Sequence, residues 1–275
     1  MFSLAKRFLA LLEVSLVSLI LTFNVWFHDA YYAYLKCSIY WHYVYPSSIM
    51  FLALLAILLP RRSFRIYGFL PRNTIFTLKW CSIFIAVFTL PSLYSIVFSI
   101  ALGISKSAEP SIHDIIQNVI DYMVFVGFFE EAYFRGYVQS RLNEVYEKRW
   151  RRLLFKEWSV NYGMSLPLTS IIFALVHIVH YWNPITSRWN PAWWMPIHIL
   201  GAFALGCLAG AIREASDIYV SASLHGAIMT SYTLLSTYTN VLILNISLFT
   251  SWFIFFYILS KYFHESTNLK FKAVE

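Results

Sequence analysis

The sequence predicts an all-α fold: a polytopic membrane helical bundle of about eight transmembrane helices with a polar intramembrane site. The first observation is composition, since the 275 residues are 59% hydrophobic and 13% charged, with a mean hydropathy of +0.60. Those values exclude an ordinary soluble domain. The second is that apolar runs of membrane-spanning length recur along the chain. The third is that the basic residues gather in alternate connections between those runs.

The apolar runs set the number of expected helices. A membrane-spanning helix needs about 20 largely apolar residues. Eight segments qualify: Phe8–Trp26, Ile39–Leu59, Trp80–Gly103, Ile115–Val138, Pro167–Trp182, Trp193–Ile212, Ile218–Thr237 and Val241–Leu259. Lys6 and Arg7 precede the first run as in a signal peptide, but the run is long and no small-residue cleavage site follows. We therefore expect a retained helix.

The basic residues predict the orientation of the bundle. With the N-terminus inside, seventeen Lys and Arg fall on the inner side: two before residue 8, five between 60 and 79, six between 139 and 166, one at Arg213 and three beyond residue 259. The outer connections contain only Lys36, Lys106 and Arg188. This bias predicts a multi-pass protein with both termini in the cytoplasm. It also explains the net charge of +7 without a nucleic-acid partner. The chain shows no retention signal, and we expect a prokaryotic plasma membrane.

The longest hydrophilic connection runs from Ser140 to Ser165. Its mixed charge and the two tryptophans Trp150 and Trp158 are compatible with a helix lying on the inner membrane surface. A solvated loop is the alternative, and the sequence does not separate the two.

The most informative stretch contains three ionisable side chains within six residues of an apolar run. Glu130, Glu131 and Arg135 lie between the apolar segments 122–129 and 136–138. An ionisable residue at membrane depth costs roughly 2.5 kcal/mol or more and marks a functional site by default. Residues four apart share a helix face, so Glu131 is expected to pair with Arg135. Glu130 points about 100° away, has no local partner and is the candidate base.

Two histidines are expected at the depth of that carboxylate. Glu130, His177 and His225 each lie about ten to twelve residues from the inner end of their predicted helix. At 1.5 Å per residue, that places all three about 15 to 18 Å from the inner surface. Three helices would thus bring one carboxylate and two imidazoles to one level. A purely structural polar network between helices is the alternative.

The motifs in this region resemble those of the CAAX protease and bacteriocin-processing family, which includes the type II CAAX prenyl endopeptidases. Glu-Glu-x-x-x-Arg stands at 130–135, Phe-x-x-x-His at 173–177, and a third histidine at His225. The segment 67–72 is similar to a short motif seen upstream of that core. The resemblance divides the chain into helices 1–3 (1–111), a CAAX-protease-like core of helices 4–7 (112–238), and a last helix with a basic tail (239–275).

The resemblance implies a role for each matching residue. Glu130 and His177 would activate a water molecule, and His225 would donate a hydrogen bond to the oxyanion of the tetrahedral intermediate. Glu131 and Arg135 would hold the site in shape, and Phe173 would pack beside His177. No cofactor and no metal would be needed.

The sequence departs from the family pattern at one position. Met229 stands where the family has a second oxyanion donor, an asparagine, and a thioether has no hydrogen-bond donor. Loss of one such donor costs about 10²- to 10³-fold in rate. Thr230, Asn245 and His198 are candidate replacements, and the sequence does not choose among them.

A zinc site is the alternative reading of the same side chains. Glu130, His177, His180 and His225 are ligand types that zinc accepts. However, the chain has no His-Glu-x-x-His motif, and its cysteines Cys37, Cys81 and Cys207 have no motif spacing. We expect no metal and no disulfide framework.

Three function classes follow from these observations. The first is an intramembrane glutamate-dependent endopeptidase that hydrolyses a peptide bond near the C-terminus of a membrane-anchored or prenylated substrate. The second, motivated by Met229, is a catalytically weak or inactive membrane scaffold or immunity-like member of the same family. The third is a proton-coupled transporter, which is disfavoured because no internal repeat is visible. The expected partners are a peptide or lipidated protein substrate and membrane lipid.

Overall fold

The structure, a computed structural model, describes residues 3–35, 39–105, 111–152 and 158–272. A helix lies at each of the eight segments expected from the sequence. The helices are α1 (Leu4–Leu35), α2 (Ile39–Leu58), α3 (Thr74–Ala101), a composite helix from α4 to α6 (Ile112–Asn143), α7 with the 3₁₀ turn η3 (Ser165–His180), α8 (Met195–Ala215), α9 (Ile218–Tyr238) and α10 (Val241–Lys272).

Five of these helices are long and apolar enough to cross a membrane, counted over the described residues. They are α1, α3, the composite helix, α8 and α10. The protein is therefore an all-α integral membrane protein. Of the other three, α7 with η3 and the Pro46–Leu58 part of α2 are apolar but shorter, and α9 is long but less apolar. The count of eight spans stays a prediction.

The composite helix differs from the regular α-helix expected over Ile115–Val138. It consists of α4 (Ile112–Val119), the π-helical segment η1 (Ile120–Phe128), α5 (Phe129–Glu131), a second π-helical segment η2 (Ala132–Val138) and α6 (Gln139–Asn143). The two glutamates thus lie on one short α-helical stretch between two wide turns. Hydrophobic periodicity cannot reveal such turns, because they leave no hydrophobic period of their own in the sequence. π-Helical segments are rare and often mark functional sites.

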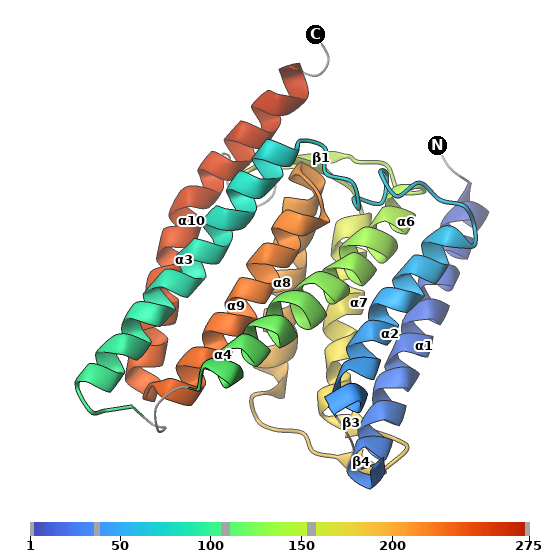
Figure 1. The fold of residues 1–275 in the computed structure, drawn as a ribbon. Coiled ribbons are helices and arrows are strands. Elements are labelled where there is room, and N and C mark those ends of the chain that lie inside the picture. The colour runs from blue at the N-terminus through green and yellow to red at the C-terminus, as the bar shows by residue number, and fades with distance from the viewer. Residues whose placement is uncertain (1–2, 36–38, 106–110, 153–157, 273–275) are drawn as a thin grey trace.

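Helix α9 lies in the middle of the bundle and packs against α3, η1, α8 and α10 (Figure 1). Its contact with η1 is made by two glycines, Gly127 and Gly226. A Cβ atom on Gly127 would lie 2.7 Å from the Cα of Gly226, and one on Gly226 would lie 2.9 Å from the Cα of Met123. Small residues at both positions therefore let the two backbones approach closely.

The start of α9 is capped by Asp217, which precedes it. The carboxylate accepts hydrogen bonds from the backbone amides of Tyr219 (3.0 Å) and Val220 (3.4 Å), and from the hydroxyl of Thr77 on α3. Burial raises the pKa of Asp217 above its ordinary value. The cap fixes where α9 begins relative to α3.

The connection Ser140–Ser165 is neither of the expected structures in its described parts. After α6, strands β1 (Trp150–Arg152) and β2 (Ser159–Tyr162) form a short antiparallel hairpin. The prediction of a helix lying on the inner membrane surface is therefore wrong. Trp158 and Val160 are buried, and the Trp158 indole donates to Ser260 Oγ of α10 (3.1 Å). Anchoring these apolar side chains on α10 favours an extended strand over a helix lying on lipid.

The described connections lie at the two ends of the bundle in the grouping that the charge pattern predicts. The start of α1, the end of α10, and the connections α2–α3, α6–α7 and α8–α9 lie at one end, which we call the basic end (Figure 1). A second hairpin, β3 (Trp182–Asn183) with β4 (Arg188–Trp189), lies at the opposite end. Lys36, Lys106 and Lys156 lie outside the described residues.

Candidate functional site

The centre of the site is a fully buried ion pair inside the composite helix. Glu131 and Arg135 are both 0% exposed, and Arg135 Nη1 lies 3.0 Å from Glu131 Oε1. The expected pairing is therefore present. Arg135 Nη2 also donates to the carbonyl oxygen of Gly206 on α8 (3.3 Å), and its guanidinium lies 4.5 Å from the ring centroid of Phe173. The arginine thus joins the composite helix to α7 and α8.

The same carboxylate also binds His225 of α9. The distance from His225 Nδ1 to Glu131 Oε1 is 3.0 Å, and His225 is 3% exposed. An ionised carboxylate only accepts hydrogen bonds, so Nδ1 must carry the proton. The remaining nitrogen, Nε2, can donate only when the ring is a doubly protonated imidazolium. The sequence analysis did not foresee this contact, because it pairs residues on different helices.

His177 is oriented by its own helix. Its Nδ1 lies 2.7 Å from the carbonyl oxygen of Phe173, one turn earlier. A carbonyl only accepts, so Nδ1 donates, and the neutral ring keeps an unshared electron pair on Nε2. His177 thereby has the tautomer that a base or a hydrogen-bond acceptor at Nε2 requires.

Phe173 lies between the two histidines. Its ring centroid is 4.5 Å from that of His177 and 5.9 Å from that of His225, both in edge-to-face geometry. Phe173 is 0% exposed. The expected packing of Phe173 beside His177 is present, and the same ring also spaces His177 from His225.

Glu130 differs from its neighbour in both burial and partners. It is half-buried, and no hydrogen bond or ion pair joins it to another residue in the described part of the chain. The structure thus brings together Glu131, Arg135, Phe173, His177 and His225. No direct bond joins Glu130 to His177 among the described residues.

Three further aromatic residues, His180, Tyr181 and His198, lie on the side of His177. The ring centroids of His198 on α8 and His180 lie 5.5 Å and 5.8 Å from that of His177. The Tyr181 hydroxyl is 2.8 Å from His198 Nδ1. The sequence suggested His198 only as a remote replacement donor, and no local motif links it to His177 because η3 and α8 are joined by a long connection.

The residues considered as replacements for the missing asparagine have different surroundings. Met229 is half-buried on α9. Thr230 is 2% exposed, and its Oγ1 has no hydrogen-bond partner among the described residues. Asn245 is exposed on α10 and donates to the carbonyl oxygen of Val241 in its own helix (2.8 Å). Asn245 is therefore not placed to serve the site.

Over the described residues, no three His, Cys, Asp or Glu side chains converge in a way that suits a metal ion.

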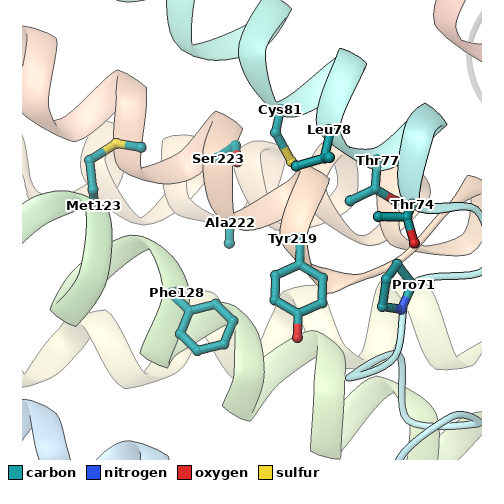
Figure 2. Close-up of a pocket in the computed structure, with 10 residues that line it drawn as sticks. All are labelled: Pro71, Thr74, Thr77, Leu78, Cys81, Met123, Phe128, Tyr219, Ala222 and Ser223. Carbon is teal, nitrogen blue, oxygen red and sulfur yellow. The ribbon is translucent and has the colours of Figure 1, made fainter.

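A separate cavity lies beside the site, between α3, η1 and α9. Figure 2 shows its lining, in which Phe128 and Tyr219 stand side by side and Cys81 and Ser223 face each other from α3 and α9. Its volume is ≈ 360 Å³. None of Glu130, His177 and His225 lines it, so it neighbours the polar cluster without containing it.

The fold and the polar cluster define an integral membrane protein with carboxylates, an arginine and histidines gathered between its helices. Residues 113–231 match the family described as type II CAAX prenyl endopeptidase Rce1-like. The resemblance expected from the motifs is thereby confirmed over this segment, which contains all six expected site residues. No curated protein and no solved structure matches the chain. The division at 112 and 238 stays a prediction.

Proposed function

We propose that the chain is a glutamate-dependent intramembrane endopeptidase of the CAAX-processing type. It would hydrolyse a peptide bond near the C-terminus of a membrane-anchored or prenylated substrate. The family match over 113–231 supports the reaction class. The observation that carries the proposal is the contrast between two adjacent carboxylates: Glu131 is engaged by Arg135 and His225, whereas Glu130 has no such partner in the described chain.

Three polar side chains take part in the proposed reaction. Glu130 takes a proton from a water molecule that His177 Nε2 helps to orient, and the water oxygen attacks the scissile carbonyl carbon. The resulting oxyanion accepts a hydrogen bond from His225 Nε2–H. The C–N bond then breaks, and the proton held by Glu130 passes to the leaving amine.

The donor role of His225 requires its imidazolium form, because Nδ1–H is already given to Glu131.

The test is cleavage by the protein reconstituted in lipid. Glu130→Gln, His177→Ala and His225→Ala should each abolish hydrolysis of prenylated peptides, whereas chelators should leave it unchanged. An enzyme that keeps full activity with Glu130→Gln would contradict the proposal. Inhibition by chelators would favour the zinc alternative.

A second candidate is a catalytically weak or inactive scaffold or immunity-like member, and Met229 is the observation that favours it. If the rest of the site is competent, Met229→Asn should raise the cleavage rate, by up to about 10²- to 10³-fold for one restored oxyanion donor. No gain across a panel of prenylated and unprenylated peptides would favour the scaffold.

The proposed location is a prokaryotic plasma membrane, with the basic end in the cytoplasm. The observation that supports this orientation is that the two described chain ends and the cation-rich connections lie at the same end of the bundle (Figure 1).

A further inference from the structure

The largest cavity among those described is not lined by Glu130, His177 or His225. Its volume is ≈ 900 Å³, and α7, α8 and α10 form its walls. It is apolar throughout: Leu200, Phe203 and Leu208 line it from α8, and Trp252 and Phe256 from α10. A cavity of this size is at the upper end for ligand sites.

The shape of this groove matches one lipid chain in one leaflet. On α8 it extends from Leu208, near the basic end, to Leu200. Eight residues of α-helix rise about 12 Å, against about 15 Å for half of a 30 Å hydrocarbon core. A second apolar groove between α7 and α8 continues from it, since Leu200 and Phe203 line both.

The mouth of the groove has the composition of a membrane interface. The β1–β2 hairpin covers it with Trp150, Trp158 and Tyr162, and such rings sit at the headgroup level of bilayers. The Trp158 ring stacks on Phe256 with centroids 6.1 Å apart. The hairpin thus lies where the headgroup of a lipid in the groove would be.

Two cations follow Trp150 on β1 and form no ion pair with any residue in the described part of the chain. Lys148 pairs with Glu214 and Arg149 with Glu147. By contrast, Arg151 and Arg152 are exposed and have no such partner among the described residues. Successive side chains of a strand point to opposite faces, so Arg152 shares the face of Trp150, which lines the groove. An apolar slot beside this arginine complements a ligand with an acyl chain and an anionic headgroup.

We propose that this groove, lined by α7, α8 and α10 under the β1–β2 hairpin, is a binding site for one anionic phospholipid. Its chain lies along α8, and its phosphate contacts Arg152, which is on the same face of β1 as Trp150. The site does not depend on the proposed peptidase activity, because none of Glu130, His177 and His225 lines it.

The test is native mass spectrometry of the detergent-solubilised protein with dioleoyl phosphatidylglycerol or dioleoyl phosphatidylcholine, which share their chains and differ in headgroup. The wild type should bind one phosphatidylglycerol more tightly than phosphatidylcholine. Arg151→Gln/Arg152→Gln should weaken phosphatidylglycerol binding by roughly tenfold or more and leave phosphatidylcholine binding unchanged. Arg61→Gln/Arg65→Gln removes the same charge from the α2–α3 connection and should have no effect.

A second variant tests the apolar part of the groove. Gly201 lines it, and a Cβ atom there would meet nothing within 4 Å. Gly201→Leu therefore fills the groove without a clash and should remove binding of both lipids, while the melting temperature is kept.

Three outcomes would overturn the proposal. They are equal affinity for the two lipids, phosphatidylglycerol binding that survives Gly201→Leu, and displacement of the lipid by a prenylated peptide, which would assign the groove to substrate. Glu130→Gln should bind phosphatidylglycerol like the wild type. The lipid-binding result can therefore be interpreted even if the peptidase test fails.

Discussion

At the residue scale, Glu131 is the side chain on which the polar cluster depends. It accepts a hydrogen bond from His225 Nδ1 and forms the ion pair with Arg135, and all three residues are almost fully buried. A buried ion pair contributes little net stability, yet removing one partner leaves the other charge without compensation. Two neighbouring glutamates are therefore expected to respond differently to the same substitution.

Glu131→Gln should destabilise the protein by about 3–5 kcal/mol, because it leaves the Arg135 guanidinium buried without a counter-ion. Glu130→Gln is the matched control, since Glu130 is half-buried and has no ion-pair partner among the described residues. Thermal unfolding in detergent should show a large decrease in melting temperature for the first variant and little change for the second. Equal melting temperatures would mean that Glu131 is not the residue that compensates Arg135.

At the scale of elements, the contact between η1 and α9 sets the position of His225. Gly226 follows His225 directly, and its Cα lies against the backbone of η1. Any added side chain would meet backbone atoms, which cannot move aside as a flexible side chain does. The distance between the two helices, and with it the distance from His225 to the composite helix, depends on the absence of one methyl group.

Gly226→Ala should therefore push α9 away from η1 and reduce cleavage. A displacement of about 1 Å at a reacting group can lower the rate by about 10²-fold. Gly201→Ala is the control: it makes the same change in a helix where a Cβ atom would meet nothing within 4 Å. Activity assays on both variants, with circular dichroism to verify helix content, would compare them. A fully active Gly226→Ala would show that the close approach is not needed.

The elements also show where sequence patterns succeed. Apolar length located a helix at every expected segment, because burying a backbone in lipid requires helical hydrogen bonding. The i,i+4 spacing correctly paired Glu131 with Arg135. The i,i+4 spacing could not predict contacts between helices, such as that of His225 with Glu131, because the rotation of each helix about its axis is set by packing. The π-helical turns and the β1–β2 hairpin were missed because neither leaves a hydrophobic period.

At the scale of the whole molecule, an ionic network fastens the helices at the basic end. Glu13 of α1 binds Arg62 after α2 (2.6 Å) and Arg141 of α6 (2.7 Å). Glu214 of α8 accepts from Gln139 (2.8 Å) and pairs with Lys148. The polar ends of α1, α2, the composite helix and α8 are thus joined, in keeping with a single membrane orientation for the whole bundle.

The orientation depends on whether the short helix α7 with η3 crosses the membrane. It has 16 residues from Ser165 to His180, about 24 Å at 1.5 Å per residue, less than the 30 Å of an average hydrocarbon core. Between Ser63 and Thr186 the chain passes through α3, the composite helix and then α7 with η3. Three crossings would place these two residues on opposite sides of the membrane, and two would place them on the same side.

Single cysteines at these exposed positions distinguish the two cases in intact cells. Thr186→Cys should react with a membrane-impermeant maleimide from outside, and Ser63→Cys should react only after lysis, because the basic end is proposed to face the cytoplasm. The unsubstituted protein, with its native cysteines, is the labelling control. Protection of both positions would mean that α7 with η3 does not cross. It would then place the β3–β4 hairpin on the cytoplasmic side and contradict the eight-span topology.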